Sequence, residues 1–208
     1  MFDLRVLGPA SISASDGRGV EALARQPRRV ALLAYLAAGS NRRRDKLLGL
    51  FWPESDDAHA RASLSQALYM LRRALGEGAI VSTGDDELRI NAEVIASDIA
   101  AFEAALAAGR LEQALAVYRG DLLDGFFINA APEFEHWLDD ERARLKQRAA
   151  DAAWSLAETS ADSGRIIEAE RWARTGADLL PTDEVVVRRL MSFLVRLGDR
   201  AAAIHSYE

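Results

Sequence analysis

The 208-residue sequence contains no cysteine. This absence excludes a disulfide framework, a thiolate metal site and a cysteine nucleophile. The sequence also lacks an uninterrupted apolar run long enough to span a membrane. Its start, MFDLRVLGP, lacks the order typical of a signal peptide, a charged start followed by a long apolar run. We therefore expect a cytoplasmic protein with no membrane partner.

Positive charge is scarce overall, because 26 basic side chains stand against 32 acidic ones, a net charge of −6. The balance differs along the chain: residues 1–95 hold 13 basic and 12 acidic side chains, whereas residues 96–208 hold 13 and 20. Within residues 22–73 there are 10 basic and 4 acidic side chains. Phosphate binding depends on the local electrostatic field and not on the net charge of the whole chain. The basic stretch 22–73 is therefore compatible with nucleic-acid binding.

The first part of the chain predicts short strands, three helices and a hairpin, in that order. A strand is expected at residues 2–6, helices at 27–39, 41–52 and 55–76, and two strands about a Gly-Asp-Asp turn at 80–90. Glycine or proline follows each helical pattern, as is typical of helix ends. This order is typical of a winged helix-turn-helix, which we assign to residues 1–95.

Residues 96–208 are rich in alanine and predicted to be almost entirely helical, beginning at the Ser97-Asp98 N-cap. Gly164-Arg165 recurs 34 residues later as Gly198-Asp199, and the run 164–181 carries the small, aromatic and proline positions of a tetratricopeptide hairpin. GRLEQALAVYRG, residues 109–120, repeats the phrase. The fold class is therefore mainly α with small β elements: a winged helix followed by an all-α, tetratricopeptide-like domain.

The small positions of the repeat are Ala169 and Gly176. Trp137, Trp154 and Trp172 lie at helical spacings among alanines and are expected in the core. Ala169 has its counterpart at Ala203, and the last unit stops at Glu208 within its second helix. Because a repeat buries its apolar face only against a neighbour or a cap, we expect the chain to be a fragment of a longer protein.

Candidate DNA-contacting residues centre on the third predicted helix, where leucines at 64, 68, 71 and 75 form a buried stripe. An α-helix fits the major groove, in which arginine binds guanine, glutamine pairs with adenine, and serine or tyrosine reaches phosphate or base. The alternative is that arginines merely solvate the helix surfaces. The candidates are Arg61, Ser65, Gln66, Tyr69, Arg72 and Arg73 on this helix, Arg28, Arg29, Arg42, Arg43 and Arg44 at the starts of the earlier helices as phosphate contacts, and Arg89 in the hairpin.

The hairpin gives an ambiguous signal. Asp85, Asp86 and Glu87 at its tip repel phosphate. Either the tip points away from DNA or only the stem of the hairpin touches it.

Signals for catalysis are weak. Glu133, His136 and Asp140 share one helix face and imitate metal ligands, but no fourth ligand or catalytic base accompanies them. His59 is interpreted as part of a helix start, and Gly17-Arg18-Gly19 is too short to replace a GxxxxGK[ST] phosphate loop. We therefore expect no enzyme, no cofactor and no metal site, and an enzyme built on residues 133–140 is the weakest alternative.

Two longer phrases carry a family resemblance. The phrase DKLLGLFWPESDDAHARASLSQALYMLRRALG, residues 45–76, is followed by a hairpin and an alanine-rich helical domain. Together they resemble the SARP-type antibiotic regulatory proteins and other regulators with a bacterial transcriptional activator domain. The segment EFEHWLDDERARLKQRA, residues 133–149, is similar to the WxxxER-type start of that family's helical repeats. The resemblance covers essentially the whole chain.

This resemblance implies an OmpR-like winged helix fused to a tetratricopeptide-like activator domain. It further implies a transcriptional activator that binds direct-repeat promoter DNA as a pair of protomers and recruits RNA polymerase. Residues 57–75 would be the recognition helix and residues 80–90 the wing. A helical-repeat scaffold, whose winged helix docks protein in place of DNA, is the alternative that the acidic tip favours.

Overall fold

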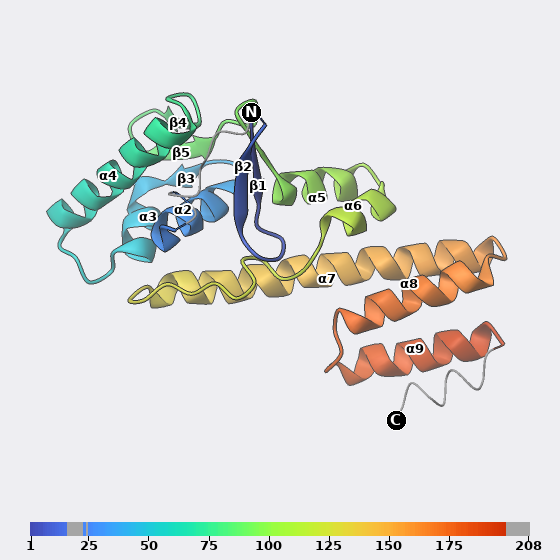
Figure 1. Ribbon diagram of the computed structural model, residues 1–208. Helices are drawn as coiled ribbons and strands as arrows, with labels where there is room; N and C mark the ends of the chain where they lie inside the picture. Colours follow the sequence, from blue (N-terminus) through green and yellow to red (C-terminus); the bar gives the residue numbers. More distant parts are fainter. Residues whose placement is uncertain (16–22, 24, 199–208) are drawn as a thin grey trace. The chain divides into compact units, whose positions relative to one another are not determined.

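The computed structural model describes residues 1–15, 23 and 25–198 (Figure 1). The chain divides into two compact units: Met1–Ala101 with Arg119–Glu141, here the winged-helix unit, and Phe102–Tyr118 with Arg142–Glu208, here the helical unit. Gly17-Arg18-Gly19, the repeat positions Asp199 and Ala203, and the expected final helix to Glu208 lie outside the described residues.

In its described residues, the winged-helix unit contains two small sheets and the three predicted helices. Its elements are β1 (Phe2–Arg5), β2 (Ser11–Ala14), α2 (Pro27–Ala37), β3 (Arg42–Arg43), α3 (Arg44–Phe51), α4 (Asp57–Leu75), β4 (Ile80–Thr83), β5 (Glu87–Ile90) and β6 (Ile95–Ser97). In one sheet β1 lies between β2, to which it is antiparallel, and β6, to which it is parallel. The other sheet has the order β3-β5-β4 and is antiparallel throughout. Strands, three helices and a hairpin therefore follow one another as predicted.

The boundaries of α4 follow from its sequence. Asp56 caps the N-terminus: one carboxylate oxygen accepts the backbone N–H of His59 at 3.0 Å and the other lies 2.6 Å from the His59 ring Nδ1. The backbone hydrogen bond from His59 is the main cause of a lowered pKa of Asp56. Gly76 ends the helix with a φ of +100°, which L side chains rarely adopt. The interpretation of His59 as part of a helix start is confirmed.

The second helix begins later than predicted. The sequence pattern indicated a helix from residue 41, but Arg42 and Arg43 form β3, paired with Leu88 and Glu87 of β5. The backbone N–H of Arg44 donates to the carbonyl oxygen of Asp86 at 2.7 Å, and α3 starts there. The start was wrong because this short strand is stabilised by partners more than 40 residues away, which helical periodicity does not register.

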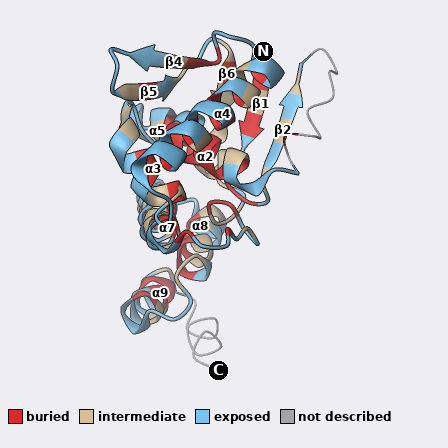
Figure 2. Cartoon of the chain, turned by 90° about the vertical axis from the view of Figure 1, so that its left-hand side faces the viewer, coloured by how far each residue is buried: buried red, intermediate tan, exposed pale blue. Residues whose placement is uncertain are grey.

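The core of the winged-helix unit is built from large side chains. Phe51 is fully buried, and its ring centroid lies 6.1 Å from that of Tyr35 and 5.1 Å from that of Phe134. Trp137 meets the ring of Tyr35 edge-on at 4.7 Å. Figure 2 shows buried residues concentrated on α2 and β1 and exposed residues along the β4–β5 hairpin. Large rings and leucines thus fill this unit beneath a more exposed hairpin.

The segment Arg119–Glu141 belongs to the winged-helix unit although it follows 17 residues, 102–118, of the helical unit. It bonds to the residues that directly follow β1: Leu123 N–H donates to Val6 O at 2.7 Å, and Gly8 N–H donates to Asp121 O at 3.0 Å. The chain therefore leaves the winged-helix unit once and returns to complete it.

The described residues contain five further helices: α5 (Asp98–Ala107), α6 (Leu111–Val117), α7 (Pro132–Asp162), α8 (Ile166–Asp178) and α9 (Glu184–Arg196). Both α5 and α7 begin in the winged-helix unit and end in the helical unit. None of the helices in the described residues is both long and apolar enough to cross a membrane.

Small residues bring the helices of the helical unit together. Ala169 and Ala173 of α8 are fully buried, and a Cβ added at Gly176 would lie 2.9 Å from Cδ1 of Trp154 on α7. Trp154 in turn meets the ring of Phe193 on α9 at 5.8 Å. The run 164–181 contains a turn and one helix, and its hairpin partner is the end of α7. The predicted core position of Trp154 is confirmed, whereas Trp172 packs against this core and is only partly buried.

Candidate nucleic-acid interface

The face of α4 opposite its buried leucines is polar and open to solvent. Leu64, Leu68, Leu71 and Leu75 are at most 2% exposed. Arg61, Ser65, Gln66, Tyr69 and Arg73 are all exposed, Tyr69 by 58%. An α-helix with one anchored face and one free polar face is the arrangement that major-groove recognition requires.

Arg61 differs from its neighbours because acidic side chains hold it. Its Nε donates to the Asp57 carboxylate at 2.9 Å, and its Nη2 lies 3.8 Å from an Asp45 oxygen. The hydrogen bond from Arg61 to Asp57, reinforced by the negative charge of that carboxylate, raises the pKa of Arg61 above its ordinary value. Its positive charge is consequently partly compensated within the protein.

Arg72 lies at the side of α4 against the hairpin and is half-buried. Its Nε and Nη2 donate to the carbonyl oxygen of Ile80 at 3.1 and 3.0 Å, and Nη2 also donates to Ser82 Oγ at 3.3 Å. Arg44, at the start of α3, donates from Nη2 to the same Ser82 Oγ at 3.2 Å. Arg72 thus fixes β4 to α4, a role that the sequence pattern did not reveal, and Ser82 was missed entirely.

The three consecutive arginines 42–44 take three different environments. The Arg42 guanidinium lies over the Tyr35 ring, 4.3 Å from its centroid, and Nε donates to Tyr35 O at 3.2 Å. A Cβ at Gly39 would lie 2.5 Å from Arg42 Cζ, so only glycine leaves this path free. Arg43 is exposed, with Nη2 3.6 Å from an Asp45 oxygen. Arg42 therefore braces α2, whereas Arg43 and Arg44 remain near the surface.

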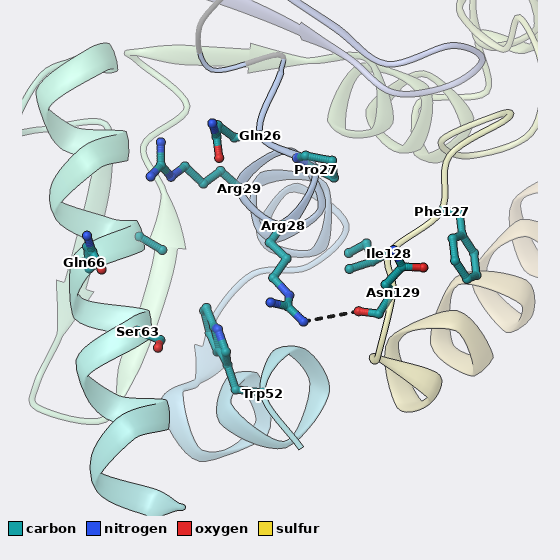
Figure 3. A pocket seen from close by; sticks show the side chains of 11 residues that line it. Gln26, Pro27, Arg28, Arg29, Trp52, Ser63, Gln66, Phe127, Ile128 and Asn129 are labelled. Carbon is teal, nitrogen blue, oxygen red and sulfur yellow. Dashed lines mark hydrogen bonds between the residues drawn. The ribbon is translucent and has the colours of Figure 1, made fainter. Parts of the chain in front are cut away.

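The start of α2 borders a cavity of about 480 Å³ (Figure 3). Arg28 Nη2 donates across it to the carbonyl oxygen of Asn129 at 3.2 Å, whereas the guanidinium of Arg29 has no hydrogen bond or ion pair with any other described residue. The cavity is lined by Gln26, Pro27, Arg28, Arg29, Trp52, Ser63, Gln66, Ala67, Phe127, Ile128 and Asn129. Arg28 and Arg29 of α2 therefore line the same cavity as Gln66 of α4. Sequence reasoning missed Trp52 and Ser63 as lining residues.

The hairpin keeps both signs of charge. Arg89 is exposed on β5, opposite Val81 of β4, and has no charged partner among the described residues. Asp85 and Asp86 are exposed in the turn, while Glu87 accepts a hydrogen bond from Asn41 Nδ2 at 2.8 Å. Arg89 therefore lies on the stem of the hairpin, and the exposed carboxylates of Asp85 and Asp86 lie at its tip.

Neutral acceptors hold several arginines of this surface. Arg28, Arg42 and Arg72 donate to backbone carbonyls, and Arg44 donates to a serine hydroxyl. A carbonyl or hydroxyl orients a guanidinium without cancelling its charge, unlike a carboxylate. The surface is thus ordered while keeping the positive charge that an anionic partner attracts.

The residues that imitated metal ligands lie on the exposed surface of α7. Glu133, His136 and Asp140 are all exposed. Across the described ranges, no group of three or more histidine, cysteine, aspartate or glutamate side chains is arranged to hold a metal ion. The arrangement of these three side chains gives the metal-enzyme alternative no support.

Comparison with known proteins adds two findings. The family model of the bacterial transcriptional activator domain matches residues 86–208. The solved structure described as Mycobacterium tuberculosis EmbR in complex with low affinity phosphopeptide is similar over 99% of this chain and 57% of that chain, with 24% identity and a TM-score of 0.67. No curated protein matches. The structural likeness supports the predicted fold class, mainly α with small β elements.

Proposed function

The chain belongs to the family of the bacterial transcriptional activator domain, and from this premise we propose that it binds specific DNA sequences and activates transcription. Two protomers bind direct-repeat promoter elements through their winged helices. The α-helical part contacts RNA polymerase. Residues 1–95 are proposed to read DNA and residues 96–208 to bind protein, with Arg119–Glu141 supporting the winged-helix fold.

One observation carries the DNA-binding proposal. Beside the exposed polar face of α4, Arg28, Arg44 and Arg72 are oriented by neutral acceptors. Neutralising phosphates with such arginines releases counterions, which drives association with DNA. The exposed Gln66 and Arg73 supply base-reading groups on the same helix.

The proposed reading geometry assigns different tasks to the candidates. Ser65, Gln66, Tyr69 and Arg73 of α4 face the major groove, with Arg61 beside them at the start of the helix. Arg28, Arg29, Arg43 and Arg44 contact flanking phosphates, and Arg89 reaches the minor groove from the hairpin stem. Arg42 acts mainly by fixing α2 in place, because its guanidinium is engaged by Tyr35. Arg72 fixes β4 through the carbonyl oxygen of Ile80 and keeps its positive charge for phosphate.

Selection of genomic DNA fragments by the purified protein tests this function. The best fragment is then titrated at low and high salt beside a scrambled duplex of the same length. We expect a repeated short element and a steep salt dependence of its affinity. Equal, weak binding to both duplexes would contradict sequence-specific recognition.

The acidic hairpin tip supports one rival, a protein-interaction scaffold. Asp85 and Asp86 are exposed and lie where a wing would approach phosphate. A scaffold would bind DNA no better than nonspecifically while forming a stable complex through residues 96–208. Co-purification with RNA polymerase, measured with and without the selected duplex, separates the two: DNA-enhanced capture fits the activator, and capture that is indifferent to DNA fits the scaffold.

A further inference from the structure

Two arginines from different helices converge on one serine hydroxyl. Arg44, the first residue of α3, places Nη2 3.2 Å from Ser82 Oγ, and Arg72, near the end of α4, places Nη2 3.3 Å from the same atom. Ser82 lies on β4, an edge strand of its sheet, and is exposed. The hydroxyl is therefore the meeting point of α3, α4 and the hairpin.

The hydrogen-bonding capacity of this cluster is unbalanced toward donors. A serine oxygen has two lone pairs, and here each receives one guanidinium N–H, which leaves the hydroxyl hydrogen to be donated elsewhere. Arginine has no acceptor atom, so neither guanidinium can take that hydrogen. The Ser82 hydroxyl hydrogen therefore has no acceptor among the described residues. The same holds for the guanidinium N–H groups that are not bonded to Ser82 or Ile80.

Charge in the cluster is equally unbalanced. Among the described residues, neither Arg44 nor Arg72 forms an ion pair with a carboxylate, so two like charges lie close together uncompensated. Arg44 Nε is also buried and has no hydrogen-bond partner in the described part of the chain. Buried polar groups are normally satisfied, and an unsatisfied cationic donor beside a second cation is stabilised when an anion approaches.

We propose that Arg44, Arg72 and Ser82 form a phosphate-binding site, which takes a phosphodiester of the DNA backbone. A phosphodiester offers two unbridged oxygens, which accept from guanidinium N–H and hydroxyl donors at once. Such a contact positions the duplex without reading its sequence. The inference rests on the proposed function for its source of phosphate, since a free phosphate ion has the same recognition chemistry.

The substitution Ser82→Asp places a carboxylate where the phosphate would bind. We expect it to weaken binding of the selected duplex by about tenfold or more and to lower the salt slope by about one unit, because one phosphate contact is lost. Thr83→Asp is the matched control, since it adds the same charge at the next exposed residue of β4. Equal losses in the two variants would overturn the proposal, because the effect would then be general repulsion.

A second measurement does not depend on any substitution. Burial of the Arg44 Nε–H slows its exchange with water and favours its detection by NMR. The wild-type protein is titrated with inorganic phosphate alone and separately with the selected duplex. Movement of the Arg44 signal with both probes, or with the duplex alone, is the expected result. Movement with inorganic phosphate alone overturns the assignment to DNA, and a signal that both probes leave unmoved overturns the site.

The outcomes distinguish this inference from the proposed function. If wild-type protein binds no duplex specifically, the proposed function fails. The titration with inorganic phosphate still tests whether Arg44, Arg72 and Ser82 bind phosphate. If wild-type protein binds specifically and Ser82→Asp behaves as Thr83→Asp does, the function stands and the phosphate site fails. A folded Ser82→Asp protein, checked by circular dichroism, is required for the comparison.

Discussion

Arginines have different partners in the two units of this molecule. In the helical unit they pair with glutamates: Arg144 and Arg148 both contact Glu103, and Arg174 contacts Glu170. In the winged-helix unit Arg28, Arg44 and Arg72 are held by carbonyl or hydroxyl oxygens. Carboxylates thus neutralise these arginines of the helical unit, whereas Arg28, Arg44 and Arg72 of the winged-helix unit retain their charge. Arg43 and Arg61 of the winged-helix unit are exceptions, because each lies against an aspartate.

The cores differ in the same systematic way. Phe51, Tyr35 and Phe134 fill the winged-helix unit with large rings, whereas Ala169 and Ala173 let the helices of the helical unit approach closely. A core of large side chains is vulnerable to truncation, and a core of small ones is vulnerable to enlargement. The role of an arginine or of a core residue therefore depends on its neighbours in the fold and not on its residue type alone.

Truncating the central ring should have the largest effect on stability. Phe51→Ala should destabilise the winged-helix unit by about 3–5 kcal/mol, because it opens a cavity at a fully buried position. Urea unfolding followed by circular dichroism measures the loss. Phe127→Ala, at a phenylalanine that is 65% exposed, is the control and should change stability by about 0.5 kcal/mol or less. Similar losses in both variants would refute this picture of the core.

Enlarging a small residue should have the next largest effect, now in the helical unit. Ala173→Leu should cost about 1–3 kcal/mol, since the buried methyl lies where α8 packs closely on its neighbours. Ala143→Leu adds the same side chain at an exposed position of α7 and serves as the control in thermal unfolding. A stable Ala173→Leu protein would show that the helices are not closely packed there.

Removing uncompensated charge should affect DNA binding more than removing compensated charge. Arg29→Ala and Arg73→Ala should each lower the salt slope for the selected duplex by about 0.9. Arg174→Ala removes an arginine that Glu170 already pairs and should leave the slope unchanged. Affinity titrations over a salt series decide between them, and equal slopes for all three variants would remove the distinction between the units. Arg72→Ala is a poorer probe because it also releases β4.

The smallest predicted effect concerns a carboxylate. Asp98 Oδ2 accepts the N–H groups of Val6 and Leu7, both at 2.8 Å, yet burial is the larger influence and raises the pKa of Asp98 above its ordinary value of 3.8. The folded state therefore retains a proton that the unfolded state releases, so this group's contribution to stability falls as pH rises from 3.8 through the folded pKa.

Asp98→Asn removes this titration. The slope of unfolding free energy against pH should become less negative in that interval, as measured by urea unfolding over a pH series. Asp124→Asn changes an exposed carboxylate of the same unit and is the control. An unchanged slope in Asp98→Asn would contradict the assigned cause.

Local signals predicted the helices well. The leucine spacing and the flanking Asp56 and Gly76 define α4, because caps and periodicity act within a few residues. They failed at β3, whose partner strand lies far along the chain. They also gave no sign that residues 119–141 complete the winged-helix unit, since that depends on backbone bonds to Val6 and Gly8.

The candidate site was predictable as a surface but not as a set of roles. The exposed face of α4 follows from helical geometry, and Tyr69, Gln66 and Arg73 lie on it as predicted. The guanidinium of Arg42 lies over Tyr35, and that of Arg72 contacts Ile80, because long side chains choose acceptors that the tertiary fold brings near. Sequence gives the charge of such a residue and leaves its partner to the fold.

The return of residues 119–141 to the winged-helix unit has a consequence for synthesis on the ribosome. A nascent chain that has emerged only to residue 101 lacks the segment that bonds to Val6 and Gly8. Its ring cluster also lacks Phe134 and Trp137. This unit therefore finishes folding only after residues 102–118 of the helical unit have been translated. The winged-helix unit does not fold as a complete domain before synthesis of the helical unit begins.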